Sequence, residues 1–249
     1  MKRVISAILL MVMICCLGCA SAEQTATGLE KFSVRNGSRE SRKIAITMDD
    51  VNEREWVWKA VELCREYGVT MTFFPNGYNM HEEDREGWLD VIDAGCEIAS
   101  HGQTHQNMKN FTAWNVVWTL MMFQENLDAA LGFHYPVRWY RPPFGNIADA
   151  DGNTREHTTA IRKCGYDHVI LWDVSETDPE KALRKVQNGS ILLFHARKRD
   201  YLCIEAMLPK LLEEGYEPVT VSELFGMELP EPGGDPYIYD KNQFRQKSN

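Results

Sequence analysis

The chain has 249 residues, with 27 Lys and Arg against 36 Asp and Glu, so its formal net charge is −9 at pH 7. This length is enough for one large α/β domain with a core of its own. The acidic balance repels phosphate backbones, which argues against a nucleic-acid partner.

Residues 1–22 have the order of a secretory signal peptide. Two basic residues, Lys2 and Arg3, precede an apolar run to about Leu17 and then the small residues "ASA". The apolar run is too short to span a bilayer comfortably. We therefore expect cleavage after Ala22 and an exported protein, either secreted or associated with the cell envelope.

The same segment contains "CLGC", which partly resembles a lipobox. In this alternative the mature chain begins at Cys19, and a lipid on that cysteine tethers the protein to a membrane. Cys16 stands where a lipobox usually has an aliphatic residue, which weakens the alternative.

The cysteines beyond the leader contain no CxxC pair and are too scattered for a disulfide framework. We expect them to be small buried apolar residues. They are Cys64, Cys96, Cys164 and Cys203.

Residues 23–42 are polar and turn-rich and predict a linker, and from residue 43 strand-like and helix-like segments alternate. The predicted strands are 43–48, 69–75, 96–100, 137–143, 168–173, 190–196 and 217–224. The predicted helices lie near 54–67, 83–94, 114–131, 154–164, 178–187 and 200–214. Short strands separated by helices predict an α/β fold with a parallel sheet, and seven such units favour a barrel over an open sheet. The domain is expected to span 43–226, and 227–249 to form a tail that is a strap or partly disordered.

Polar side chains follow five of these strands at their C-terminal ends. In α/β barrels the active site is built at that end. The residues are Asp49, Asp50, His101, His105, Arg141, Asp173, Asp178 and His195. Their gathering on one rim predicts a single site.

A metal site is the first chemistry that this rim suggests. His101 and His105 are four residues apart, so they project from the same side of one helical turn and can share an ion. With Asp50 they would form a facial triad that leaves coordination positions for water and substrate. Each part also has a plainer explanation, because an Asp can cap the next helix and a histidine pair can be structural. The triad allows hydrolysis on a Lewis-acidic ion such as zinc, or oxygen activation on iron(II).

The other rim residues favour hydrolysis. Asp49 lies beside the proposed ligand and could serve as base, and His195, at the end of the apolar run "ILLF", could protonate a leaving nitrogen. Arg141 could hold Asp49 as an anion, and a backbone N–H of "RPPFG" could face an oxyanion. An oxygenase has no evident use for this second set. The alternative for His195 is a buried structural histidine.

Taken in order, these segments resemble a known family. "ITMDD", "ASHGQTH", "YRPPFG", "LWDVSETD" and "ILLFH" are similar to the five motifs of the polysaccharide deacetylases (NodB homology domain, carbohydrate esterase family 4). The resemblance covers roughly 43–226. It implies a distorted (β/α)7 barrel and a hydrolase that removes acetyl groups, most often N-acetyl, from a glycan such as peptidoglycan or chitin.

The resemblance also assigns the metal centre. Asp50, His101 and His105 would bind one divalent ion, expected to be zinc, with cobalt or nickel as alternatives. Asp49 would be the catalytic base, and Arg141 would orient it.

The remaining roles carry over from the last three motifs. The amide of Phe144 would bind the oxyanion, and His195 would be the general acid. Asp178 would pair with His195 and tune it. Trp172 and Leu193 would line the pocket for the acetyl methyl group.

The chain departs from the family pattern in the groove wall. Val51–Asn52 replace the usual Gly-Pro, Ser175 and Pro179 replace an Asp and a Trp of the fourth motif, and Ala196 replaces an Asp. Phe144 stands where Tyr is usual. These changes leave two alternatives open: a non-catalytic, metal-containing glycan-binding relative, and a hydrolase of a small non-sugar amide. The sequence makes no prediction about oligomeric state.

Overall fold

β2 (Lys43–Asp50) is the central strand of the fold, and all of it except Lys43 is buried. The computed structural model describes residues 29, 31–166 and 168–240. In it, β2 pairs in parallel with β3 (Thr72–Pro75) on one side and with β6 (Ile191–His195) on the other. The three strands therefore end at the same edge, as the parallel arrangement predicts.

The sheet curls instead of staying flat. β4 (Glu97–Ile98) pairs with β3, and β7 (Glu217–Pro218) pairs with the start of β2. Beyond β4, single parallel bridges link Ser100 to Tyr140, Tyr140 to Val169, and Val174 to Leu192 of β6. β1 (Ser33–Val34) pairs with β5 (Val169–Ile170). The strands and bridges thus lead back to β6, and the fold is the distorted (β/α)7 barrel expected from the sequence.

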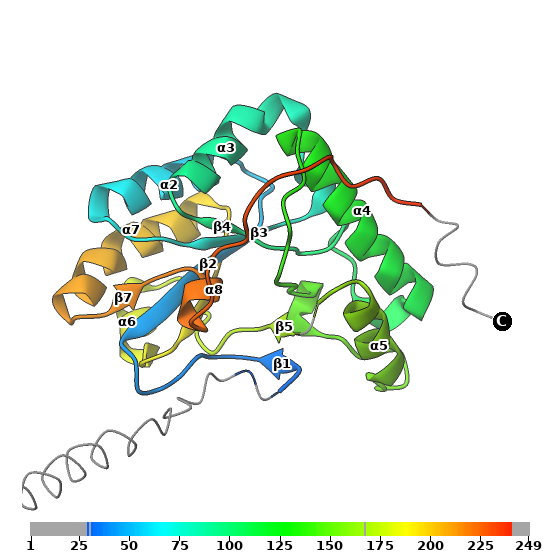
Figure 1. Ribbon diagram of the computed structural model, residues 1–249. Coiled ribbons are helices and arrows are strands. Elements are labelled where there is room, and N and C mark those ends of the chain that lie inside the picture. Colours follow the sequence, from blue (N-terminus) through cyan, green and yellow to red (C-terminus); the bar gives the residue numbers. More distant parts are fainter. Residues whose placement is uncertain (1–28, 30, 167, 241–249) are drawn as a thin grey trace, which may run out of the picture.

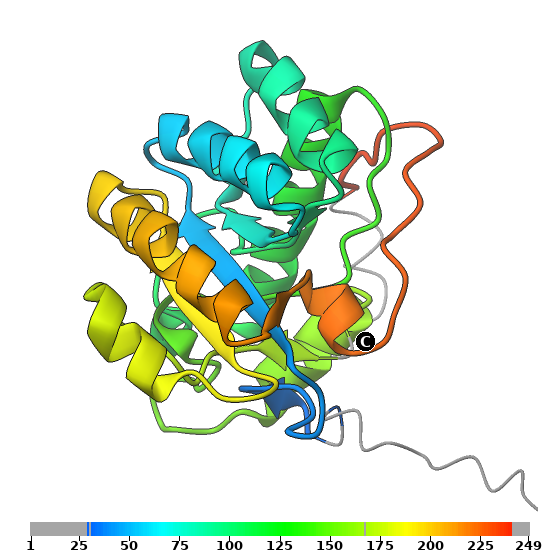
Figure 2. The same cartoon turned by 90° about the vertical axis from the view of Figure 1, so that its left-hand side faces the viewer.

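Helices cover the outside of the sheet (Figure 1). The helices are α2 (Glu55–Tyr67), α3 (Arg85–Asp93), α4 (Ala113–Leu131), α5 (Arg155–Lys163), α6 (Pro179–Lys185), α7 (Lys198–Glu213) and α8 (Val221–Leu224). Short 3-10 turns are η1 (Gly77–Asn79), η2 (Glu82–Asp84), η3 (Met108–Asn110) and η4 (Pro143–Gly145). Figure 2 shows α2 and α7 side by side, next to β2 and β6.

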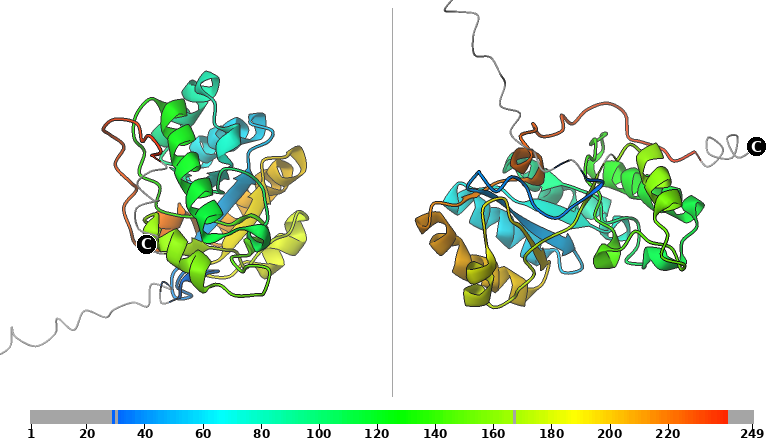
Figure 3. Two further views of the ribbon diagram at one scale, coloured as in Figure 1. Left: turned by 90° about the vertical axis from the view of Figure 1, so that its right-hand side faces the viewer. Right: turned by 90° about the horizontal axis from the view of Figure 1, so that it is seen from below.

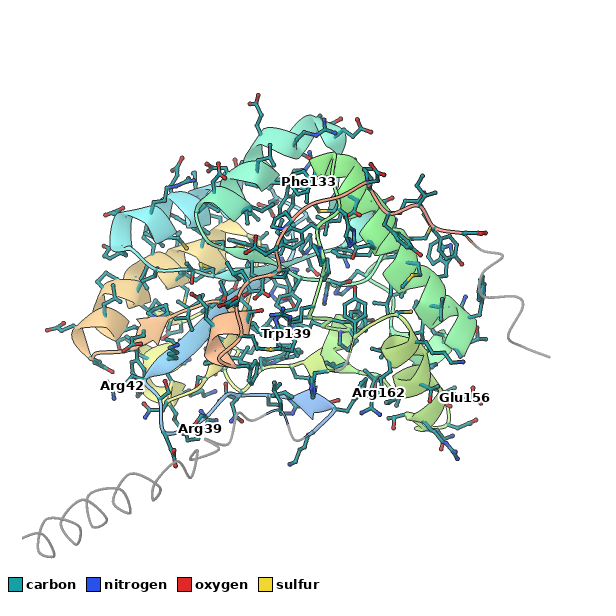
Figure 4. The ribbon with its side chains drawn as sticks, viewed as in Figure 1. Arg39, Arg42, Phe133, Trp139, Glu156 and Arg162 are labelled. Carbon is teal, nitrogen blue, oxygen red and sulfur yellow. The ribbon has the colours of Figure 1, made fainter. Side chains whose placement is uncertain are left out.

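The two faces of β2 pack into different cores because side chains alternate along a strand. Ile44, Ile46 and Met48 join the cluster formed with the outer helices. Ala45 faces the barrel interior and joins the cluster around Trp139, which lies among packed side chains in the middle of the molecule (Figure 4). Asp49 lies on the same face of β2 as Ala45, so the alternation directs its side chain into the barrel.

Several predicted strands are shorter in the structure, and three predicted segments differ in kind or extent. Part of the predicted linker 23–42 belongs to the folded domain, because β1 pairs with β5 and the Gly37 N–H donates to the Gly189 carbonyl (2.8 Å). The predicted strand 137–143 is reduced to the bridge at Tyr140. The predicted strand 217–224 ends after two residues, because a capping box between Thr220 and Glu223 starts α8.

The segment after α8 forms a strap across α4 (Figures 1 and 3). The Tyr237 N–H donates to the buried Asp128 carboxylate (2.7 Å), and the Gly233 N–H donates to the His134 carbonyl (2.9 Å). Up to Asp240 the predicted tail 227–249 is thus a strap, one of the two forms expected for it.

The predicted signal peptide 1–22 and Cys19 lie outside the described residues. Among the residues that are described, no helix is both long and apolar enough to cross a membrane. The cysteines in this part of the chain form no disulfide, and Cys64, Cys96 and Cys203 are buried as expected. Cys164 differs from the expectation, because it is only partly buried.

Candidate active site

The predicted metal ligands meet at the C-terminal edge of the sheet. Asp50 ends β2, and its Oδ1 lies 3.4 Å from the Nε2 atoms of both His101 and His105. One potential ligand atom from each residue lies within 4.8 Å of the other two. Asp50 Oδ1 is buried and has no hydrogen-bond partner. An ion-binding group fits this site, because an orphaned carboxylate oxygen beside two imidazole nitrogens is the donor set of a divalent metal.

The backbone at the end of β2 turns sharply to present Asp50. Asp50 and Val51 have φ angles of 71° and 61°, which are rare for residues other than glycine and especially for a β-branched residue. The Asp50 carbonyl accepts hydrogen bonds from the Asn76 N–H (3.3 Å) and from Asn79 Nδ2 (2.9 Å). These hydrogen bonds stabilise the strained turn. Because of the turn, the direction of the Asp50 side chain no longer follows the strand alternation that directs Asp49 into the barrel.

A backbone contact selects the tautomer of His101. Its Nδ1 lies 2.7 Å from the Arg141 carbonyl oxygen, which can only accept a hydrogen bond. Nδ1 must therefore carry the proton, and the lone pair of Nε2 is directed toward Asp50. The chain thus supplies both the imidazole and the contact that orients it for a metal.

His105 is more exposed, and its ring lies against Phe144 with 4.7 Å between the ring centroids. Desolvation lowers the pKa of His105, although Asp50 opposes this effect. Burial alone raises the pKa of Asp50, but the neighbouring His101 and His105 outweigh it and lower that pKa. Both shifts favour the forms that bind a metal, a neutral imidazole and a carboxylate.

Asp49 is held by a buried arginine. Arg141 Nη1 donates to Asp49 Oδ1 (2.6 Å) and to Thr47 Oγ1 (2.7 Å). The same guanidinium donates to the carbonyls of Ile170 and Leu171 (3.1 and 3.3 Å). Burial lowers the pKa of Arg141, but Asp49 opposes this, so the two buried charges compensate each other. The contact expected between Arg141 and Asp49 is present.

His195 lies next to Asp49, its register partner in the β2–β6 ladder, and its side chain is 31% exposed. Among the described residues, no ion pair joins His195 to the expected Asp178. Asp178 Oδ1 instead accepts the Lys181 N–H (2.9 Å) as the N-cap of α6, and Pro179 at the first helical position fixes this start. The Asp200 Oδ2 atom, from the first turn of α7, lies 3.9 Å from His195 Nδ1.

The remaining predicted site residues are Phe144, Trp172 and Leu193. Phe144 has a φ of 63°, and in the described part of the chain its N–H donates to no backbone carbonyl. The residue is 61% exposed. Trp172 packs so closely on Gly145 that an added Cβ there would lie 2.9 Å from the indole. Leu193 is buried on β6.

Two other charged residues near the rim, Asp173 and Arg197, have different surroundings. Asp173 supports the fold, because it accepts hydrogen bonds from Arg39 Nη2 (2.6 Å) and the Ile191 N–H (2.8 Å). Arg197, which the sequence pattern did not single out, places Nη2 3.5 Å from Asp50 Oδ2. Arg197 and Asp200 could be anticipated only from their closeness to His195 in the sequence.

Known proteins similar to this chain include polysaccharide deacetylases, the family whose motifs the sequence resembles. The family profile described as "Polysaccharide deacetylase" matches residues 36–169. A peptidoglycan-N-acetylglucosamine deacetylase of Bacillus cereus is 27% identical over 225 residues, which cover 81% of this chain and 95% of that protein. A bifunctional xylanase/deacetylase of Pseudobutyrivibrio xylanivorans is 25% identical over 206 residues, which cover 78% of this chain. The chain spans only 32% of the length of that bifunctional protein.

Among solved structures, a pseudoenzyme of the CE4 family from Bacillus anthracis has a similar fold. Its TM-score is 0.68 at 23% sequence identity, and the match covers 79% of this chain and 70% of the other. At this identity the likeness supports the fold, and the activity has to be argued from the site.

Proposed function

Since the chain belongs to the polysaccharide deacetylase family, we propose that it is a metal-dependent hydrolase that removes acetyl groups, chiefly N-acetyl, from a glycan. The observation that carries this proposal is the triad of Asp50, His101 and His105 with Asp49 and His195 beside it. A metal site alone would not require the buried Arg141–Asp49 pair or a histidine at the end of β6. Together they supply a metal centre, a base and an acid at one rim.

Asp50, His101 and His105 would hold the ion, for which zinc, cobalt and nickel are the candidates. When bound, such an ion acts as a Lewis acid on the acetyl carbonyl and lowers the pKa of a water molecule to ~7. The His101 tautomer and the orphaned Asp50 Oδ1 support this ligand set.

Asp49 would take the proton from the attacking water. Its Oδ1 is engaged by Arg141 at 2.6 Å, so Oδ2 is the atom that remains for the proton. The four hydrogen bonds of the guanidinium fix the orientation of the carboxylate. Such positioned proton transfer contributes a rate factor on the order of 10²–10⁴.

His195 would protonate the leaving nitrogen. Without this proton the nitrogen would have to leave as an anion, which is a poor leaving group. The Phe144 N–H would donate to the oxyanion, because no backbone carbonyl of the described residues accepts from it. Trp172 and Leu193 are proposed to contact the acetyl methyl group.

An acetylated glycan of the peptidoglycan or chitin type is the proposed substrate class. The B. cereus relative, matched over 95% of its length, is named for peptidoglycan N-acetylglucosamine. Two exposed aromatic rings, Tyr78 and Phe144, offer flat apolar faces of the kind that sugar rings pack against. A peptidoglycan substrate fits the predicted export, which would place the protein in the cell envelope.

A second candidate is a glycan-binding relative without turnover, because one structural neighbour is a pseudoenzyme. To separate the two, protein loaded with zinc or cobalt is incubated with N-acetylated chito-oligosaccharide, peptidoglycan, acetylated xylan and a small acetamide, and released acetate is measured. We expect release from an N-acetylated glycan, and loss of release in Asp49→Ala while one metal ion per chain remains bound. Glycan binding without acetate from any member of the panel would contradict the proposal.

A further inference from the structure

The first turn of α7 carries a buried carboxylate that needs an explanation. Asp200 is 4% exposed, and its Oδ1 is buried without a hydrogen-bond partner. Burying a carboxylate oxygen without a hydrogen-bond partner is costly, so such a group is rarely present without a role. Among the described residues, the one ion-pair contact of Asp200 is to His195, with 3.9 Å between Oδ2 and Nδ1.

The chain path explains how this contact arises. β6 ends at His195, and the Arg197 N–H donates to the His195 carbonyl (2.7 Å) to form a tight turn. α7 then begins at Lys198, and its first turn carries Asp200 back over the imidazole. A carboxylate in the first turn is also stabilised by the helix dipole. Burial raises the pKa of Asp200, while the neighbouring His195 and Arg197 favour its charged form.

The acidic residues of the preceding loop are engaged elsewhere. Asp178 caps α6, Asp173 binds Arg39 and the Ile191 N–H, and Glu176 pairs with Lys185. Ser175, where the family usually has an Asp, carries no charge. Asp200 is therefore the carboxylate that the fold brings to Nδ1 of His195.

We propose that Asp200 is a positioning residue for His195: its carboxylate faces Nδ1 across 3.9 Å, favours a proton on that nitrogen, directs Nε2 into the active site and stabilises the imidazolium. This inference rests on the proposed function of His195 as general acid. In the reaction, Nε2 loses its proton to the leaving nitrogen, while the Nδ1 proton stays on the imidazole, facing the Asp200 carboxylate. A fixed Nδ1–H tautomer keeps the Nε2 lone pair available to be protonated again.

The test combines NMR and kinetics on the whole chain loaded with zinc. Spectra of ¹⁵N-histidine-labelled protein, with the His195 signals assigned by their absence in His195→Gln, report which ring nitrogen carries the proton in the neutral form. Other charged groups near His195, namely Asp49, Asp50, His105 and Arg197, are unchanged in every variant compared. We expect Nδ1–H in the wild type and a mixture of tautomers in Asp200→Asn. We also expect kcat to fall by roughly 10²-fold in Asp200→Asn with KM changed by less than about twofold, because a general acid is affected and binding is not.

Two comparisons make the test specific. Glu213→Gln removes an exposed carboxylate from the far end of α7 and should alter neither tautomer nor kcat. Asp178→Asn tests the partner that the sequence suggests. A wild-type spectrum with Nδ1 unprotonated, or a tautomer that responds to Asp178→Asn and not to Asp200→Asn, would overturn the inference. The wild-type spectrum decides even if Asp200→Asn fails to fold. If the wild type releases no acetate but the His195 tautomer still changes in Asp200→Asn, the proposed function is contradicted and the pairing of Asp200 with His195 is supported.

Discussion

Replacing Arg141 by Leu should be one of the most destabilising single changes in the domain. The guanidinium is fully buried and donates to Asp49, to Thr47 and to the carbonyls of Ile170 and Leu171. Without it, the 2% exposed Asp49 is left as a buried charge with no counter-ion. Removing one partner of a buried ion pair costs about 3–5 kcal/mol, which is a large fraction of the stability of an ordinary domain.

The assay is urea unfolding followed by tryptophan fluorescence, in the presence of a chelator so that metal binding does not contribute to stability. The same substitution is repeated in an Asp49→Asn background, where no charge is left uncompensated. We expect the cost of Arg141→Leu to be smaller there by about 1–3 kcal/mol, as is usual for residues in direct contact. Arg197→Leu is the matched control, because that side chain is 56% exposed and should change stability by less than about 1 kcal/mol. An equal cost of Arg141→Leu in both backgrounds would refute the charge-compensation reasoning.

Three other predictions concern residues outside the metal centre. Asp178→Ala should lower the free energy of unfolding by about 1 kcal/mol in urea titrations, because it removes the N-cap of α6; an unchanged value would contradict the capping role. Burial raises the pKa of Glu97 above 4.5, so the folded state binds this proton more tightly than the unfolded state. The free energy of unfolding should therefore fall as pH rises above about 4.5, and urea titrations should show a weaker fall in Glu97→Gln. Burial raises the pKa of Cys203 to about 11 and that of Cys164 to about 12, so both thiols should react with a thiol reagent at pH 7 many times more slowly in native protein than in urea; equal rates would contradict their burial.

Much of the site could be predicted because its residues stand at strand ends. A parallel sheet brings those ends to one edge, so Asp49, Asp50 and His195 are near one another whatever the details of packing. His101 and His105 complete the ligand set, but the helical turn expected from their spacing is wrong, because residues 101–107 form a non-helical loop. The alternating pattern likewise located the helices to within a few residues, because each carries an apolar face toward the sheet.

The partner of His195 could not be predicted in the same way. Asp178 lies in a segment that resembles a family motif, but its local position before Pro179 makes it a helix cap. Asp200 reaches the imidazole only because the turn at Arg197 folds α7 back on β6, and this tertiary approach leaves no periodic signal. The start of α8 was missed for a related reason: the apolar alternation of 217–224 suggested a strand, while Thr220 and Glu223 stabilise a helix.

The central claim is that one divalent ion is bound by Asp50, His101 and His105 and is required for deacetylation. Cobalt is added stepwise to metal-free protein, and the visible absorption of the ion is recorded together with the rate of acetate release from an N-acetylated glycan. We expect both signals to rise together and to saturate at one ion per chain, and both to be lost in His101→Ala. Acetate release that is independent of occupancy, or full cobalt binding by His101→Ala, would contradict the claim.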